Sequence, residues 1–376
     1  MKFLDQSAIR RQNVLKMLQL LTGHAPRTRQ SLADDAHLSL MTVSNLVEQL
    51  RAQNVLSLTP VDRSSTRSRA AGRKAENIAL SGEKHLWLII DLSGSHFFFT
   101  LMAFDLCTLL EGSAPTEGDY AQALRHFLDD TQRQIAPFLH DRQLLGVAVV
   151  TPGPYEIATD TVYNQRLPQI NALHIKKECR EHLGDYEYYV DEDVKFAVRA
   201  FTPLIETDSC EMLYYLFIGE GVGGAAVHSL NMMRGLNATA GDPGQLLSPE
   251  GGTFESRLSL SAFAAQLQCN VDDLPRLAQE NPQLYLTALE KSADEAAAML
   301  ECVLWVLDPC RIVIDCRYAA HLEEPFVSRI RYTLSRRFAA SGRRLPQFFA
   351  APKGMSSILR GAVQVLQREW VERLWN

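Results

Sequence analysis

From Lys84 onward, apolar runs of strand length alternate with segments of helical periodicity, a pattern with few structural solutions. The apolar runs are HLWLIIDL, HFFFTLMAFD, LLGVAVV, YEYYV, MLYYLFIG and RIVID. We expect helices at residues 120–139, 194–201, 293–307 and 356–374. Strands that alternate with helices are typical of sheets covered by helices, so the sequence predicts an α/β fold.

Two turns divide this region into two expected lobes. The first, at residues 91–95, joins a pair of strands, and the second is the glycine-rich segment at residues 219–224. Small ligands commonly bind in a cleft between lobes, so we expect a ligand there.

The composition is that of an ordinary globular protein, with 376 residues and 46% apolar content. This length predicts two or three domains. The seven cysteines are dispersed without C-x-x-C spacing, which predicts neither a disulfide framework nor a cysteine-rich zinc site and favours the reducing cytoplasm. The apolar runs fall short of the roughly 20 residues that a membrane span needs, so no membrane insertion is expected.

Charge is distributed unevenly along the chain. Residues 1–84 contain 13 Lys and Arg and 7 Asp and Glu, a net charge of +6, whereas the other 292 residues contain 25 and 37, a net charge of −12. Phosphate neutralisation supplies most of the affinity for nucleic acids. A polyanion partner is therefore expected for the N-terminal module alone.

The first 56 residues predict three helices. The third begins after Ser39, a residue type suited to cap a helix N-terminus. Its expected buried stripe consists of Val43, Leu46, Val47 and Leu50. Its expected DNA-contacting residues are Met41, Thr42, Ser44 and Asn45. Two short helices around a tight turn, the second with small polar residues exposed, are typical of a helix-turn-helix that enters a major groove. The alternative for this surface is an ordinary exposed helix face.

The next segment, LSLTPVDRSSTRSRAAGRKAENIAL, predicts a β-hairpin wing and a linker. Arg63, Arg67, Arg69 and Arg73 lie within it. A basic run of this kind is often only a solvated loop. Directly after a helix-turn-helix, contacts with phosphates or with the minor groove are the favoured interpretation.

Several segments together resemble the ROK family (repressors, open reading frames and sugar kinases), in its winged-helix regulator branch of the NagC/XylR/Mlc type. They are VVTPGPYE, NQRLP, VDEDVKFAV, GEGVGG, RGLNATAGDPGQL and RIVID, preceded by the helix-turn-helix segments and AGRKAENIAL. The resemblance implies a winged helix-turn-helix domain with linker at 1–81, followed by a two-lobed actin-like or hexokinase-like (RNase H-like) body at 82–376. The small lobe would comprise 82–196 and the C-terminal helix 356–376, and the large lobe 197–355.

The nucleotide-binding elements of the family's sugar kinases are altered. The first phosphate turn, Asp-x-Gly-Gly-Thr in the family, keeps only one glycine at residues 91–95. The second keeps its glycines at residues 219–224 but contains Glu220, whose charge would repel a triphosphate. A glycine run that accommodates adenosine is replaced by Asp315-Cys316-Arg317.

The sugar and zinc elements are altered as well. The triplet Glu-Asn-Asp is here Asp191-Glu192-Asp193, in which Asp193 is the vestige of the catalytic base. Gly-Glu-x-Gly-His becomes a segment ending in Gln245, and residues 246–268 contain no cysteine, so no zinc ligand set remains. The candidate sugar-binding residues are Glu192, Asp193, Asp242 and Gln245. The alternative is an acidic cleft without a ligand.

These interpretations predict a cytoplasmic transcription regulator, specifically a repressor of carbohydrate metabolism genes, without enzymatic activity, metal or cofactor. Its expected partners are double-stranded operator DNA, a sugar or sugar-phosphate effector, and a regulatory protein, with assembly as a homodimer or homotetramer. The alternative function is an ATP-dependent sugar kinase of the ROK family.

For the last helix, core packing is favoured. The alternative is an interface, through Trp370 and Trp375, with another protomer or an inhibitory partner.

Overall fold

The structure is a computed structural model that describes residues 6–23, 25–60, 76–205, 212–352 and 355–375. The chain forms two compact units. Unit 1 comprises Met1–Pro152, Ile157–Asp191 and Val363–Asn376, and unit 2 comprises Gly153–Glu156 and Glu192–Ala362. The predicted boundaries of the head domain and of the two lobes stay predictions.

Unit 1 begins with three helices, α1 (Gln6–Leu21), α2 (Arg29–Ala36) and α3 (Leu40–Ala52). The Ser39 side chain accepts a hydrogen bond from the Thr42 N–H at 3.0 Å, which confirms the predicted cap of α3. The buried residues of α3 are the predicted stripe, Val43, Leu46, Val47 and Leu50. Two strands, β1 (Leu56–Pro60) and β2 (Glu76–Leu80), then pair antiparallel.

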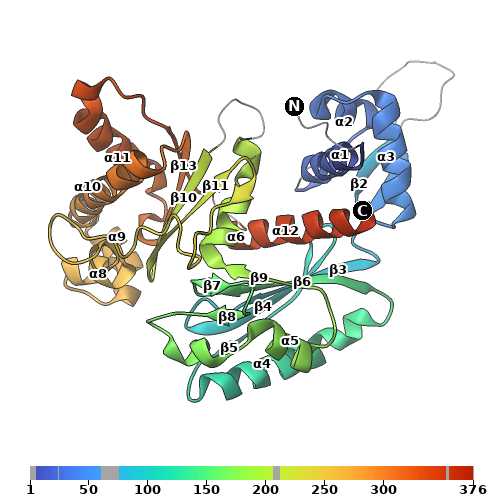
Figure 1. The fold of residues 1–376 in the computed structure, drawn as a ribbon, viewed down its shortest axis with the longest axis horizontal. Helices are drawn as coiled ribbons and strands as arrows, with labels where there is room; N and C mark the ends of the chain where they lie inside the picture. Colours follow the sequence, from blue (N-terminus) through green and yellow to red (C-terminus); the bar gives the residue numbers. More distant parts are fainter. Residues whose placement is uncertain (1–5, 24, 61–75, 206–211, 353–354, 376) are drawn as a thin grey trace. The chain divides into compact units, whose positions relative to one another are not determined.

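A five-stranded sheet forms the centre of unit 1, in the order β5-β4-β3-β6-β9. Its strands are β3 (His85–Asp91), β4 (His96–Ala103), β5 (Thr108–Pro115), β6 (Gln143–Thr151) and β9 (Tyr188–Glu192). α4 (Tyr120–Ile135) packs onto β4 and also contacts α5 (Ile175–Leu183). The ring of Phe127 on α4 lies 5.3 Å from that of Phe97. The predicted strand pair around residues 91–95 is confirmed (Figure 1).

Unit 2 repeats the same strand order in a second sheet, β12-β11-β10-β13-β14. Its strands are β10 (Met212–Ile218), β11 (Val222–His228), β12 (Asn231–Met232), β13 (Arg311–Cys316) and β14 (Gln347–Ala350). Side chains alternate across β10 because successive residues of a strand point to opposite faces. Tyr214 and Leu216 pack in the larger core, whereas Leu213 and Tyr215 pack against α6 (Asp193–Arg199).

Helices of unit 2 supply the larger core on one face of this sheet (Figure 1). They are α7 (Phe254–Leu258), α8 (Leu260–Gln266), α9 (Leu274–Glu280), α10 (Pro282–Val306) and α11 (Glu323–Phe338). The helix predicted at 293–307 is the second half of α10, which begins at Pro282. Two further strands, β7 (Tyr155–Glu156) and β8 (Thr161–Val162), have two residues each.

The last helix, α12 (Ser357–Leu374), passes from unit 2 into unit 1. Trp370 is buried, with its ring 5.2 Å from that of Phe104, so core packing is correct for this residue. Trp375 lies instead beside α1, where the Arg10 guanidinium is 5.6 Å from its ring. Arg11 forms an ion pair of 3.0 Å with Glu372.

No helix among the described residues is long and apolar enough to cross a membrane. Cys107, Cys179, Cys269, Cys302 and Cys316 are free thiols, whereas Cys310 is disulfide-bonded. The cysteine spacing predicted no disulfide framework. It did not reveal the disulfide of Cys310, because spacing along the chain does not show which thiols lie together in the fold.

Candidate functional site

The first two turns of α3 present side chains to solvent in unit 1. Met41 is 75% exposed and Asn45 is also exposed, whereas Thr42 and Ser44 are half-buried. The Thr42 hydroxyl lies 2.8 Å from that of Ser39, so it is engaged at the helix N-terminus. Met41, Ser44 and Asn45 are therefore the predicted contact residues whose side chains are available to a ligand.

The remainder of the exposed face of α3 is held by the neighbouring helices. Glu48 accepts a hydrogen bond of 2.9 Å from Arg29 on α2, and Gln49 accepts one of 3.2 Å from Arg10 on α1. These contacts fix the orientation of α3 within the three-helix group. A surface on α3 can therefore approach a partner without a change in the packing of the helices.

The predicted contacts Arg63, Arg67, Arg69 and Arg73 lie outside the described residues. By sequence, residues 61–75 contain five cationic side chains and one acidic side chain, a net charge of +4. The net charge of residues 1–84 is +6. In the described part, Arg29 also pairs with Glu76 at 2.6 Å. Most of the net positive charge of this region therefore belongs to residues 61–75.

The candidate sugar-binding residues all belong to unit 2, where Glu192 is buried and paired. Lys195, one turn into α6, donates to the Glu192 carboxylate and to the carbonyl of Ala238. The backbone N–H of Tyr155 donates to the same Glu192 oxygen at 2.9 Å. Lys195, itself 1% exposed, supplies the compensating charge for Glu192.

The other candidate residues lie closer to solvent. Asp193, at the start of α6, is half-buried, and Asp242 and Gln245 are exposed. The Gln245 side chain donates to Glu255 at 3.3 Å, and Glu255 also accepts from the Val222 N–H at 3.2 Å. This arrangement offers carboxylates and an amide, groups that can hydrogen-bond to hydroxyls.

The glycine-rich segment is the tight turn of a β-hairpin, because Ile218 pairs with Val222 across it. Its last glycine has a packing role. A Cβ atom at Gly224 would lie 2.1 Å from the hydroxyl of Tyr214, which donates to the Gly241 carbonyl at 2.8 Å. Burial, together with nearby Asp242, raises the pKa of Tyr214. Close packing therefore requires a glycine at position 224.

The corresponding turn in unit 1 is closed on itself. The Asp91 carboxylate accepts hydrogen bonds from the N–H and the hydroxyl of Ser93, at 2.9 and 2.6 Å. A phosphate-binding turn presents backbone N–H groups to the ligand. In this turn, the N–H of Ser93 has an internal acceptor instead.

The segment after β13 is filled by side chains, as predicted. Cys316 is buried, and the Arg317 guanidinium lies 5.6 Å from the ring of Phe217. The next residue, Tyr318, is stacked on Phe263 with 4.0 Å between ring centroids and 5° between planes. An adenine ring entering at this position would have to displace buried aromatic side chains.

Hydrogen bonds order part of residues 246–268, the segment in which the sequence predicts no zinc ligands. Ser248 donates to Glu295 on α10 at 2.5 Å, and Arg257 donates to the same carboxylate oxygen at 3.1 Å. Thr253 and Ser256 form a capping box at the start of α7. These polar contacts hold the segment against α10. A cavity of about 350 Å³ beside it is lined mainly by charged and polar residues.

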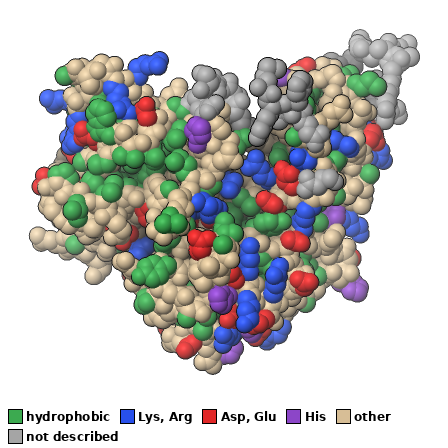
Figure 2. Space-filling model, in the orientation of Figure 1, with side chains coloured by type: hydrophobic (Ala, Val, Ile, Leu, Met, Phe, Trp, Pro, Cys, Tyr) green, Lys and Arg blue, Asp and Glu red, His purple; other side chains and the backbone are tan. Residues whose placement is uncertain are grey.

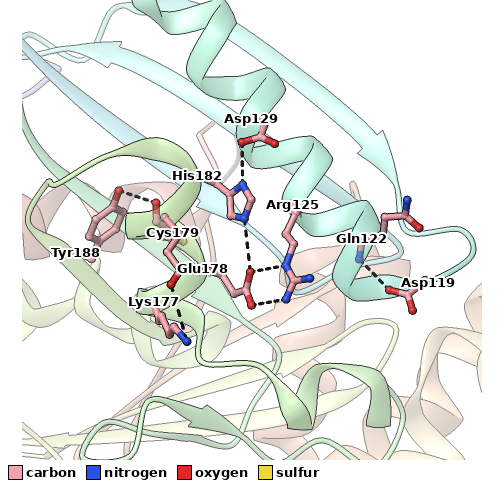
Figure 3. A network of polar contacts seen from close by, with 10 residues as sticks. Asp119, Gln122, Arg125, Asp129, Lys177, Glu178, Cys179, His182 and Tyr188 are labelled. Carbon is pink, nitrogen blue, oxygen red and sulfur yellow. Dashed lines mark hydrogen bonds and ion pairs between the residues drawn. The ribbon is translucent and has the colours of Figure 1, made fainter.

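Among the described residues, one group of side chains has the composition of a metal site: Glu178, Glu181 and His182 on α5. Figure 3 shows Arg125 of α4 bound to both oxygens of Glu178, at 2.8 and 2.9 Å. This arginine is the main reason that the pKa of Glu178 is lowered. Because the guanidinium already occupies the carboxylate, the network functions as a link between α4 and α5.

Sequence comparison assigns the chain to a family through its residues after the first three helices. The ROK family profile matches residues 88–369, about three quarters of the chain. The chain belongs to the ROK family. None of the curated proteins matches it.

Solved structures of ROK proteins share the fold at low identity. A ROK transcriptional regulator, a homologue of the E. coli Mlc protein, has a TM-score of 0.67 at 16% identity and covers 96% of this chain and 97% of its own. A Streptococcus pneumoniae ROK protein in complex with sucrose has a TM-score of 0.60 at 17% identity, covering 77% and 100%. A Streptomyces griseus ROK glucokinase, in complex with glucose and AMPPNP, has a TM-score of 0.60 at 18% identity, covering 74% and 98%.

Two residues that contact the candidate sugar-binding residues were not predicted from the sequence. Glu255 contacts the predicted Gln245, but ten residues of intervening chain conceal the relationship. Lys195 follows Glu192 at helical i,i+3 spacing, a signal that could have been recognised from the sequence. Its second partner, the carbonyl of Ala238, is recognisable only in the fold.

Proposed function

We propose that this ROK protein is a sequence-specific DNA-binding transcription regulator, and specifically a repressor of sugar metabolism genes. In this proposal residues 1–81 form a winged helix-turn-helix domain, with α3 as the recognition helix and β1 and β2 as the wing. The observation that carries the proposal is the exposure of Met41 and Asn45 in the first two turns of α3, a helix whose opposite face is buried.

The extent of the structural similarity supports this assignment. The regulator structure covers 96% of this chain, whereas the glucokinase structure covers 98% of its own length but only 74% of this chain. About a quarter of the present chain therefore has no counterpart in that kinase.

In the proposed role, Met41 offers an apolar contact for a thymine methyl group, and Asn45 offers an amide that pairs well with adenine.

The body would act as a sensor and assembly domain. We propose a homodimer or homotetramer in the cytoplasm, whose two-fold symmetry places two α3 helices about 34–36 Å apart, or a multiple of this, on a near-palindromic operator. Asp193, Asp242 and Gln245 remain candidates for a sugar or sugar-phosphate effector, and a regulatory protein is the alternative signal. A ligand can act only by binding two states with different affinities.

A sugar kinase is the second candidate, favoured by the retained Asp193 and by the similarity to glucokinase structures. Three observations oppose it: the closed Asp91 turn, the aromatic stack at Tyr318, and the pairing of Glu192 with Lys195. Phosphoryl transfer depends on correct positioning of nucleotide and metal together. Release of ADP from magnesium ATP in the presence of a sugar panel, abolished by Asp193→Asn, would support the kinase.

The test of the regulator is a fluorescence-anisotropy titration of the full chain with promoter fragments and with random DNA, at several salt concentrations. Specific binding should be about 10³-fold tighter or more. An Arg67→Ala, Arg69→Ala, Arg73→Ala variant should weaken binding to both DNAs and reduce the slope against log salt by roughly 0.9 for each phosphate that is no longer neutralised. Equal affinity for both DNAs at every salt concentration would contradict the proposal.

A further inference from the structure

A basic segment lies within the otherwise acidic body. Residues 325–368 contain nine Lys and Arg and no Asp or Glu, a net charge of +9. Residues 85–324 contain 15 Lys and Arg and 35 Asp and Glu, a net charge of −20. In unit 2 this basic segment begins within α11, directly after the first two residues of the helix, Glu323 and Glu324, and continues into the chain that follows it.

Large apolar side chains are exposed next to these arginines. Trp305 and Val306, at the end of α10, are 62% and 80% exposed, and Tyr332 on α11 is 53% exposed. Arg343 lies 4.6 Å from the ring of Trp305, and Arg336 lies 5.9 Å from that of Tyr332. Figure 2 shows Lys and Arg side chains gathered among hydrophobic ones at the upper left, where Figure 1 has α11.

Only part of this positive charge is neutralised within unit 2. Arg329 pairs with Asp294 at 2.6 Å. Arg337 pairs with Glu301 at 2.5 Å, and Arg343 pairs with Asp308 at 2.5 Å. Arg331, Arg336 and Arg344 are exposed and form no ion pair with the described residues. We use the name α11 patch for the exposed side chains at the end of α10, on α11 and in the chain after it, which are Trp305, Val306, Arg331, Tyr332, Arg336 and Arg344.

We propose that the α11 patch is a docking site for a protein whose contact surface carries carboxylates around an apolar side chain. Aromatic residues and arginine are enriched at the centres of protein interfaces, and complementary charge selects the partner. A two-fold contact between two copies of this patch would place like charges opposite each other. Duplex DNA would supply phosphates for the arginines, but its thymine methyl groups lie within the major groove and are too small to cover both Trp305 and Val306.

The test is a display selection of random 12-residue peptides on the immobilised full chain, with counter-selection on a Trp305→Ser, Arg331→Glu, Arg336→Glu variant. Enriched peptides should be acidic and contain a large apolar residue. Their affinity, measured by fluorescence anisotropy, should fall at least about tenfold in the variant. The control is Arg133→Glu on α4, a 76% exposed side chain in unit 1, which should leave peptide affinity unchanged.

Several results would overturn the proposal. One is a lack of enrichment over the counter-selected pool, or enrichment of neutral or basic peptides. A loss of self-association in the variant by light scattering would assign the patch to a second copy of the chain. A loss of DNA affinity in the variant would assign it to nucleic acid. Circular dichroism and thermal unfolding of each variant verify that it is folded, so that weaker binding reports on the patch.

Discussion

The carbonyl oxygen of Phe196 lies 1.7 Å from the position that a Cβ atom at residue 361 would occupy. α12 can approach α6 this closely because residue 361 is glycine, and α6 begins at the candidate site residue Asp193. This backbone contact within unit 2 therefore requires a glycine where α12 passes α6.

Gly361→Ala should force α6 and α12 apart. Overpacking of a core costs about 1–3 kcal/mol, and we expect the upper end of this range because the clash is with backbone. Urea unfolding followed by circular dichroism measures the loss. Gly94→Ala is the matched control, since its Cβ atom would have its nearest neighbour at 3.9 Å. Equal stability of the two variants would contradict the close approach.

Lys195→Met should be strongly destabilising because it leaves the buried Glu192 carboxylate without its cation. Removing one partner of a buried ion pair costs about 3–5 kcal/mol. The double variant Glu192→Gln, Lys195→Met removes the uncompensated charge and should recover much of the loss. A double-mutant cycle of unfolding free energies tests this. Strict additivity of the two single changes would show that Glu192 and Lys195 do not interact.

Glu295→Ala should destabilise unit 2, since Ser248 and Arg257 lose their common acceptor. The expected loss is about 1–3 kcal/mol, and Glu290→Ala, whose exposed carboxylate is 3.9 Å from Arg329, is the control.

Because hydrogen bonds hold the segment that contains Ser248 and Arg257, a chelator should leave the unfolding midpoint of the wild-type chain unchanged. A lower midpoint after incubation with EDTA would mean that a metal contributes to its order.

The Arg125–Glu178 contact should contribute stability that is lost in acid. The pKa of Glu178 is lowered in the folded chain, so its contribution is present above the ordinary value of about 4.5 and is lost as the pH falls through the lower folded value. The difference in unfolding free energy between the wild type and Glu178→Gln should therefore be constant from pH 7 to about pH 5 and shrink below about pH 4.5. A difference independent of pH down to pH 3 would refute this.

Much of the fold was predictable because its central strands are long apolar runs with clear ends. Edge strands were harder to recognise: β5, Thr108–Pro115, contains Gly112 and Pro115 and alternates only weakly. α11 was missed although its buried residues recur at helical spacing, so this helix could have been predicted from the sequence.

The candidate site was predicted less completely than the fold. Periodicity was sufficient to find the buried and exposed faces of α3. In unit 2, family motifs located Asp193 and Asp242, but the partner of Glu192 and the role of Glu255 depend on contacts between distant segments. Such contacts are set by the packing of the sheet and its helices, which a local pattern does not specify.

The central claim is that α3 reads DNA sequence. The most direct measurement is an in vitro selection from random duplex DNA with the full chain and with Asn45→Ala, sequencing the bound pools. We predict that the wild type enriches a near-palindromic motif and that the variant loses preference at one position of each half-site, at a cost of about 1–3 kcal/mol. Enrichment of no motif, or of the same motif by both proteins with equal affinity, would contradict the claim.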